Sequence, residues 1–318
     1  MIIIKVKTIK FILINIILYS FFSFSLHAYA KDKAHDYQIE SQIINMLSNK
    51  IEVLKANNPN ARLSFFVDWD GTMMNGDITE GLHDQVPQAE RFMGLAELAF
   101  KYGLVQVPLD APSEYKDYVA EYEKLLLIDH GIAYAWSANY FANLPPQKEL
   151  LLRELINNYF KAKLKSEVFK TSSNIVNFLK AQGIEIFVIS ASPTVFVEGT
   201  LNVFPWLTID HVYGINRAKN VNGNLIDPII NYAMGKVERI NSILSQDEDR
   251  VILGGMGNSW NTDGAFLQLI AQKGGVSVMF NGGKPNSYNY SGIYKYNISE
   301  TLGSEFNSNR VACKKILE

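Results

Sequence analysis

Apolar residues recur every three or four positions over residues 37–56, which is the pattern of a helix with one buried face. The apolar positions there are Ile39, Ile43, Ile44, Leu47, Ile51 and Leu54. The pattern ends at the Asn-Asn-Pro-Asn sequence of residues 57–60, which is typical of a helix stop. Similar patterns cover residues 172–181 and 232–244. We therefore predict a helix over each of these three segments.

Short apolar runs lie between the helical patterns, and we interpret them as buried strands. They cover residues 63–67, 184–189, 207–212, 251–253 and 276–280. Strands that alternate with helices indicate a parallel sheet with helices on its faces. The expected fold class is therefore α/β, with a Rossmann-like parallel sheet as its core.

The interval between the first two predicted strands is roughly 100 residues long, which is too long for a single crossover connection. Its pattern is helical and it is rich in aromatic residues. We predict an inserted helical cap over residues 80–170. The core domain would then consist of residues 31–79 and 171–318.

Residues 1–30 have the order of a secretory signal peptide. Three lysines precede a nearly continuous apolar stretch over residues 11–26, and alanines stand at positions 28 and 30. The stretch has about 16 residues, whereas a membrane-spanning helix needs about 20. We expect cleavage near Ala30, a periplasmic or secreted bacterial protein, and no stable membrane association afterwards. An uncleaved membrane anchor is the alternative.

Composition excludes several classes of function. The 318 residues include 30 Lys+Arg and 32 Asp+Glu, for a formal net charge of −2. Nucleic-acid binders are usually clearly basic, so we expect no nucleic-acid partner. The single cysteine, Cys313, excludes an intramolecular disulfide and a four-cysteine zinc site. The histidines also lack the H-E-x-x-H spacing of a zinc hydrolase.

The first candidate site follows the strand at residues 63–67. Asp68 and Asp70 stand directly after it, followed by Gly71 and Thr72. Ligands of open parallel sheets bind beyond the carboxyl ends of the strands. One carboxylate there can attack as a nucleophile while the other transfers a proton, and both can bind a divalent cation. An acidic turn without chemistry is the alternative.

Three further positions could complete such a site. Ser190 follows the second strand and can bind a phosphate oxygen, although serine is also common as a helix N-cap. Lys236 can hold a phosphoryl group and offset the aspartates, although a solvated lysine is the alternative. Asn258 and Asp263 follow the fourth strand and can supply oxygen ligands to a metal. An irregular polar loop is the alternative for these two residues.

The order of these motifs, with a large insertion after the first, resembles the haloacid dehalogenase (HAD) superfamily of phosphohydrolases. The matching positions are Asp68-x-Asp70-Gly71-Thr72, Ser190, Lys236, and Asn258 with Asp263. The insertion is similar to the helical cap of the phosphoserine-phosphatase-like branch. Residues 77–80, 134–136 and 141–144 resemble, more narrowly, the bacterial phosphorylcholine phosphatases, which are exported enzymes.

The resemblance implies an exported, Mg²⁺-dependent phosphomonoesterase, with phosphocholine as a candidate substrate. Asp68 would attack phosphorus and form an aspartyl-phosphate, and Asp70 would first protonate the leaving oxygen and then activate water. The phosphate-binding residues would be Ser190, Lys236, Gly71 and Thr72. The magnesium ligands would be Asp68, Asp70, Asn258 and Asp263.

Asn258 departs from the pattern of the superfamily, whose fourth motif usually opens with an aspartate that binds the metal. An amide oxygen can coordinate Mg²⁺ but brings no charge, so we expect weaker metal binding unless Asp263 compensates. Two alternatives therefore remain beside the first interpretation. One is a broad-range or phosphoserine-type phosphatase, and the other is a catalytically impaired binding protein.

Aromatic residues of the insertion suggest how a substrate would be recognised. Trp136, Tyr134 and Tyr140 are candidates for a cage around a quaternary ammonium group, with Glu80 or Asp77 as the counter-charge. Each cation–π contact is worth about 0.5–2 kcal/mol. Packing inside the cap is the alternative for these aromatic residues.

Overall fold

The computed structural model describes residues 35–82, 91–283 and 291–303. The predicted signal peptide and Cys313 lie outside these residues. Six parallel strands form one sheet in the order β5-β4-β1-β6-β7-β8. Their bounds are β1 Arg62–Val67, β4 Glu185–Pro193, β5 Val212–Ile215, β6 Arg250–Gly257, β7 Val276–Phe280 and β8 Ile293–Tyr296. The predicted α/β fold class is confirmed.

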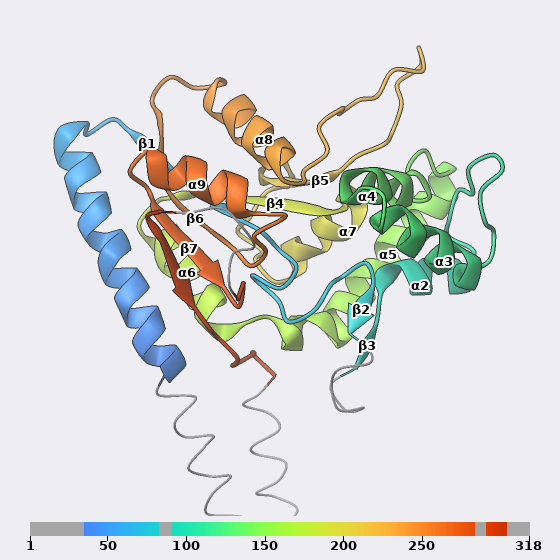
Figure 1. Cartoon of the computed structure of the whole chain (residues 1–318), viewed down its shortest axis with the longest axis horizontal. Coiled ribbons are helices and arrows are strands. Elements are labelled where there is room, and N and C mark those ends of the chain that lie inside the picture. Colours follow the sequence, from blue (N-terminus) through green and yellow to red (C-terminus); the bar gives the residue numbers. More distant parts are fainter. Residues whose placement is uncertain (1–34, 83–90, 284–290, 304–318) are drawn as a thin grey trace, which may run out of the picture.

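Strand β1 lies inside the sheet between β4 and β6, and its side chains alternate between the two faces. Phe65 and Val67 pack into the larger apolar cluster, with the helix of residues 35–57 and α6 (Lys170–Ala181). Phe66 packs into a second cluster, with helices α8 and α9. These two helices span Met234–Leu244 and Gly264–Gln272. Helices therefore cover both faces of the sheet (Figure 1), which explains why β1 reads as a continuous apolar run.

Strands β4 and β6 run to Pro193 and Gly257, beyond the ends predicted at residues 189 and 253. Two other strands differ more. The strand predicted over residues 207–212 is wrong, because this stretch contains a 3₁₀ turn (Ile209–His211) and the strand begins only at Val212. Leu207 lies in a loop, but its side chain is buried, so its apolar character resembled that of a strand residue. Strand β8 has no counterpart in the prediction, because it is a short edge strand whose two central residues are exposed.

The long interval between β1 and β4 is helical, as predicted. It opens with an antiparallel pair, β2 (Gly81–Leu82) and β3 (Phe92–Met93). Four helices follow, which we call the inserted helices: α2 Leu95–Lys101, α3 Tyr115–Leu126, α4 His130–Asn139 and α5 Pro146–Ala162. A 3₁₀ turn (Leu164–Glu167) leads back to α6. Figure 1 shows α2 to α5 grouped to one side of the sheet, beyond β4 and β5.

The first and last parts of the described chain are joined by one buried carboxylate. Asp36 is 3% exposed, at the start of the helix of residues 35–57. Its Oδ2 accepts hydrogen bonds from the backbone N–H groups of Ser299 (2.9 Å) and Glu300 (2.8 Å). Among the described residues, no helix has the length and apolar character needed to span a membrane.

Candidate active site

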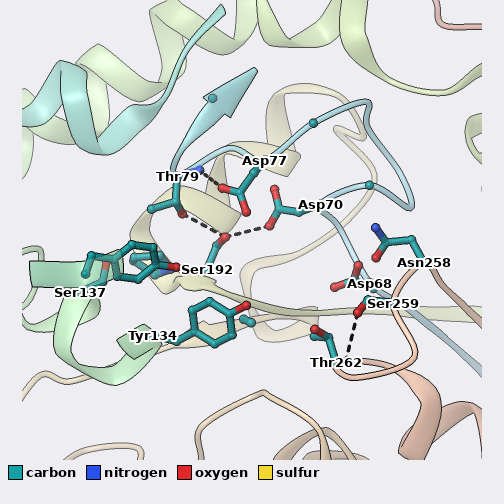
Figure 2. Close-up of a pocket in the computed structure, with 16 residues that line it drawn as sticks. Asp68, Asp70, Asp77, Thr79, Tyr134, Ser137, Ser192, Asn258, Ser259 and Thr262 are labelled. Carbon is teal, nitrogen blue, oxygen red and sulfur yellow. Dashed lines mark hydrogen bonds between the residues drawn. The ribbon is translucent and has the colours of Figure 1, made fainter. Parts of the chain in front are cut away.

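A cavity of about 510 Å³ lies beyond the carboxyl ends of β1, β4 and β6. Asp68, Asp70 and Asn258 line it from the sheet, and Tyr134 and Ser137 line it from α4. Figure 2 shows these side chains around one open space. The cavity thus lies where a parallel sheet is expected to bind its ligands.

Asp68 is 4% exposed and lies directly after β1. Its Oδ1 accepts a hydrogen bond from Lys236 Nζ at 2.6 Å, and its Oδ2 accepts one from Thr72 Oγ1 at 2.9 Å. The same Nζ donates to Asp263 Oδ1 at 2.6 Å. Burial and the negative charge of Asp263 raise the pKa of Asp68 to about 7, and the Lys236 ammonium opposes this rise. One buried cation therefore serves two carboxylates, and an additional cation would stabilise ionised Asp68.

Asp263 is fully buried, and protein groups bind both of its oxygens. Oδ1 accepts from Lys236, and Oδ2 accepts from the backbone N–H groups of Asn258 (2.9 Å) and Ser259 (3.0 Å). The residues that line the cavity include Asn258 and Ser259 but not Asp263. In this geometry Asp263 positions Lys236 and the loop after β6, and Asn258 is the residue of this motif that reaches the cavity.

Asp70 is held by donors from two segments that are far apart in the sequence. Its Oδ1 accepts from the backbone N–H of Ile78 at 2.7 Å. Its Oδ2 accepts from the hydroxyls of Ser192 (2.7 Å) and Ser190 (3.1 Å). Thr79 Oγ1 in turn donates to Ser192 Oγ at 3.0 Å, and Figure 2 shows this chain from Thr79 to Asp70. The carboxylate of Asp70 is thereby fixed at the edge of the cavity.

Burial raises the pKa of Asp70 well above its usual value, and the negative charges of Asp77 and Asp68 add to this effect. A raised pKa keeps a carboxylic acid protonated at a higher pH than usual. Proton donation by a carboxylic acid near neutral pH requires such a shift. The environment of Asp70 therefore suits a general acid.

The four predicted phosphate-binding residues occupy different places. Gly71 lines the cavity at a left-handed φ of 68°, and a Cβ there would lie 1.9 Å from Asn258 Nδ2. The left-handed turn therefore favours glycine, and a larger residue there would displace the amide of Asn258 from this position. Lys236, Thr72 and Ser190 are fully buried and bind the two aspartates. Their contacts in the structure position Asp68 and Asp70.

The oxygen donors at this point fit a hard divalent cation. Asp68, Asp70 and Asn258 line the same cavity, and Figure 2 shows the three side chains. Carboxylate and amide oxygens are the ligands that Mg²⁺ and Ca²⁺ take in proteins. Within the described ranges no group of three or more His, Cys, Asp or Glu side chains is arranged for metal binding. Because the side chain of Asp70 suits a proton donor, the Asp68 carboxylate and the Asn258 amide would have to provide the side-chain ligands, and Asp70 would bind through its backbone carbonyl.

The outer part of the cavity is acidic and aromatic. Asp77, Tyr122, Tyr134 and Ser137 line it, and no lysine or arginine does so in the part of the chain that the structure describes. Asp77 Oδ1 accepts from the backbone N–H groups of Thr79 (2.6 Å) and Glu80 (2.8 Å). These contacts hold the carboxylate of Asp77 at the cavity. Burial raises the pKa of Asp77, and the two backbone hydrogen bonds oppose this rise.

The structure separates the three predicted cage residues. Tyr134 lines the cavity, with its ring 5.4 Å from that of Tyr232. Trp136 and Tyr140 instead pack around Tyr118, with ring centroids 5.2 Å and 5.0 Å from it, and neither lines the cavity. For Trp136 and Tyr140, the geometry matches the packing alternative. Glu80 lies next to this region, with a side-chain hydrogen bond to Tyr122.

The cavity residues that the sequence analysis did not select include Ser192, Thr79 and Tyr122. The alternation of side chains along a strand would have placed Ser192 on the same side as Ser190. Tyr122 belongs to the stripe Tyr115, Tyr118 and Tyr122 on α3, whose spacing predicts a shared face but does not say which ring reaches a cavity. For Thr79 no local signal existed, because its contact with Ser192 spans 113 positions.

Comparisons with known proteins detect similarity at the level of structure. No protein-family model matches the chain, and no curated protein matches it significantly. A protein of unknown function from Bordetella pertussis Tohama I is 14% identical, with a TM-score of 0.51 over 70% of this chain and 92% of that one.

Two further solved structures overlap less well. A functionally unknown protein from Anaerococcus prevotii is 17% identical over 73% of this chain and 81% of that one, with a TM-score of 0.43. A HAD family hydrolase from Salmonella enterica serovar Typhi is 12% identical over 77% of this chain and 70% of that one, with a TM-score of 0.44. At such identities the comparisons show the fold alone: a Rossmann-like parallel sheet with helices on both faces.

Proposed function

We propose that the protein is a phosphatase of the HAD type, which hydrolyses phosphomonoesters through an aspartyl-phosphate at Asp68. The observation that carries the proposal is the pairing of Asp68 with Asp70 at the end of β1, with Lys236 on the first and two serine hydroxyls on the second. A nucleophile, a proton donor and a fixed cation then lie at one edge of a cavity.

In the first step, an oxygen of Asp68 forms a bond to phosphorus while the bond from phosphorus to the ester oxygen breaks. Asp70 gives its proton to that oxygen, which leaves as an alcohol. Lys236 and Thr72 orient the attacking carboxylate through its two oxygens, and each oxygen keeps a lone pair for the attack. The raised pKa of Asp70 supplies the proton at neutral pH.

In the second step, Asp70 is ionised and takes a proton from a water molecule as that water attacks phosphorus. The bond between phosphorus and Asp68 breaks, and inorganic phosphate leaves. The hydroxyls of Ser190 and Ser192 stabilise the ionised form of Asp70 between the two steps, because both donate to it. Asp68 and Asp70 thus return to their starting states.

Mg²⁺ is the cofactor that we propose, held by Asp68, Asp70 and Asn258. When bound, it supplies positive charge that offsets the repulsion between the carboxylates and the phosphoryl group. Two like charges 4 Å apart repel by about 4 kcal/mol at an effective dielectric constant of 20, so the acidic cavity needs this compensation. Asn258 brings no charge, and we therefore expect the magnesium requirement to be high.

For the substrate, we propose a phosphomonoester whose alcohol part carries a positive charge, with phosphocholine as the candidate. Asp77 provides a carboxylate in the outer cavity, and Tyr122 and Tyr134 provide aromatic faces. A quaternary ammonium group gains from both kinds of contact. The predicted signal peptide places the enzyme in the periplasm or outside the cell, where it would act on such small molecules.

The test is phosphatase activity of residues 31–318 with Mg²⁺ on phosphocholine, phosphoserine and p-nitrophenyl phosphate. Asp68→Asn should lower kcat/KM by about 10³-fold or more, because an amide is a poor nucleophile. The matched control is Asp110→Asn, at an exposed aspartate with a φ of 60°, which asparagine tolerates.

Unchanged turnover in Asp68→Asn would refute the mechanism. Turnover by the parent that persists in excess EDTA would refute the role of Mg²⁺. Absence of turnover by the parent, with retained binding of phosphocholine, would favour the catalytically impaired binding protein. Equal rates on all three substrates would refute the proposed cationic selectivity and favour a broad-range phosphatase.

A further inference from the structure

A second cavity, of about 260 Å³, lies between the inserted helices and the sheet. We call it the seam cavity. One wall is formed by residues 141–144 with Glu149 and Arg153 of α5, and the other by residues 193–195, Glu198 and residues 215–219. Among the described residues, Pro193 alone lines both this cavity and the active-site cavity. The seam cavity is thus a neighbouring but separate space.

The seam cavity is lined by a half-buried arginine with one unsatisfied donor atom. Arg217 lines it, and its Nε is buried with no hydrogen-bond partner in the part of the chain that the structure describes. A buried donor without an acceptor is rare in proteins, and such a group usually indicates a water molecule or a ligand. The Nε–H of Arg217 is therefore available to an oxygen acceptor that enters the cavity.

The acidic residues of the seam cavity are already engaged. Glu149 Oε1 accepts from Arg153 Nε (3.1 Å) and Nη2 (3.0 Å), and Glu198 Oε2 accepts from Arg153 Nη1. Arg153 therefore binds both carboxylates. Arg217 has no ion pair within the described ranges, and Lys219 brings a further positive charge to the same wall. The lining of the seam cavity holds three basic and two acidic residues, so its formal net charge is +1.

The segment that carries Arg217 is held in place by two asparagines. Asn216 Oδ1 accepts from the backbone N–H of Ala218 at 2.9 Å, which forms a turn directly after β5. Asn143 Oδ1, in the loop between the inserted helices α4 and α5, accepts from the backbone N–H of Lys219 at 2.9 Å. Arg217 thus lies in a fixed turn that touches the insertion, and a ligand bound there would contact both parts of the fold.

We propose that the seam cavity binds a small organic anion whose carboxylate or phosphate group pairs with Arg217. A guanidinium binds such groups through two parallel hydrogen bonds. Phe141, Leu144 and Ile215 also line the cavity and would contact a short apolar body. The volume lies just below the usual range for small-molecule sites of about 300–1,000 Å³, so the ligand is short. The proposal does not depend on the phosphatase mechanism.

The test uses butyrate, which has a carboxylate and a short apolar chain and no bond that a phosphatase can hydrolyse. Binding to the full chain is measured by calorimetry in EDTA, where the carboxylates of the active-site cavity repel anions. We expect saturable binding at one site. Arg217→Gln should weaken it by about tenfold or more, because a charged hydrogen-bonding group is lost. Inorganic phosphate in place of butyrate shows whether the head group alone suffices.

Two further variants keep the test decisive. Lys161→Gln removes an exposed lysine of α5 outside the cavity and should bind butyrate like the parent. Arg217→Lys keeps the charge but loses the two parallel hydrogen bonds, so its affinity should lie between those of the parent and Arg217→Gln. If Arg217→Gln does not fold, Arg217→Lys provides the comparison.

The proposal is overturned if the parent shows no saturable binding of butyrate or phosphate up to about 10 mM. It is also overturned if both Arg217 variants bind like the parent.

Discussion

The floor and the roof of the active-site cavity are built by different parts of the fold. The floor consists of Asp68, Asp70 and Asn258, which follow strands of one sheet. The roof consists of Tyr122 and Tyr134, which come from the inserted helices α3 and α4. Floor residues are fixed by hydrogen bonds and ion pairs to buried groups, whereas roof residues are placed by the packing of helices. We therefore expect the floor to determine whether the chemistry occurs and the roof to determine the choice of substrate.

The largest effect should come from the floor, in Asp70→Asn. The amide cannot donate an acidic proton or activate water, so kcat should fall by about 10²–10⁴-fold. The loss should be larger for an alkyl phosphate such as phosphocholine than for p-nitrophenyl phosphate, whose leaving group needs less protonation. Steady-state kinetics on both substrates measures this difference. An equal loss on both would contradict the role of Asp70 as the acid of the first step.

A smaller effect should come from the roof, in Tyr134→Leu. Loss of the aromatic face should lower kcat/KM for phosphocholine by about 2–30-fold, since one cation–π contact is worth about 0.5–2 kcal/mol. The rate on p-nitrophenyl phosphate should stay within about twofold, because that substrate has no cation for the ring to bind. Tyr134→Phe keeps the ring and should behave like the parent.

Tyr140→Leu is the matched variant for a tyrosine that packs inside the insertion and does not line the cavity. Its hydroxyl donates to the backbone carbonyl of Pro112, so this change should lower thermal stability and leave the ratio of the two substrates unchanged. A change of that ratio in Tyr140→Leu, with none in Tyr134→Leu, would reverse our assignment of the two residues.

The smallest effect should be on the stability of the metal-free protein. The pKa of Asp68 is about 7 in the folded chain, against about 3.9 in an unfolded one. Between pH 4 and 7 the unfolded state therefore releases a proton that the folded state retains, and stability falls as pH rises. The Asp68→Asn variant has no carboxyl group at this position and does not lose this stability. The difference between its Tm and that of the parent, both in EDTA, should therefore grow by a few degrees in favour of the variant between pH 4 and 7.

Thermal unfolding at several pH values measures this difference, and Asp110→Asn should show no such trend. Mg²⁺ should stabilise the parent more at pH 7 than at pH 5, because it binds the ionised carboxylates. A constant difference in Tm between Asp68→Asn and the parent would contradict the raised pKa of Asp68.

The sequence predicted the central strands of the sheet better than its two edge strands, β5 and β8. The strand at residues 276–280 was predicted with its observed bounds, because every residue in it is buried and all but Ser277 are apolar. Strand β8 and the start of β5 were not predicted, since an edge strand is half exposed and a buried loop residue such as Leu207 is as apolar as a strand residue. Local hydrophobicity reports burial, and burial identifies a strand only in the middle of the sheet.

The floor of the cavity could be predicted from the sequence and the roof could not. Strand ends bring their following residues to one edge, so the positions after β1 and β6 were sufficient to select Asp68, Asp70 and Asn258, which line the cavity. In the insertion, Tyr134 and Trp136 are two positions apart, yet Tyr134 lines the cavity and Trp136 packs against Tyr118. The rotation of α4 against its neighbours decides this outcome, and it depends on contacts with α3 that the sequence pattern does not specify.

The carboxylate of Asp36 connects the beginning and the end of the described chain, through Ser299 and Glu300. The helix of residues 35–57 and the segment after β8 are therefore held together although more than two hundred residues separate them. The segment after β8 also binds the chain near α6, through backbone hydrogen bonds from Lys170 N–H to Glu300 O and from Leu302 N–H to Val168 O, both 2.8 Å long. Loss of the Asp36 carboxylate would therefore release the N-terminal helix from this segment and leave the segment attached near α6.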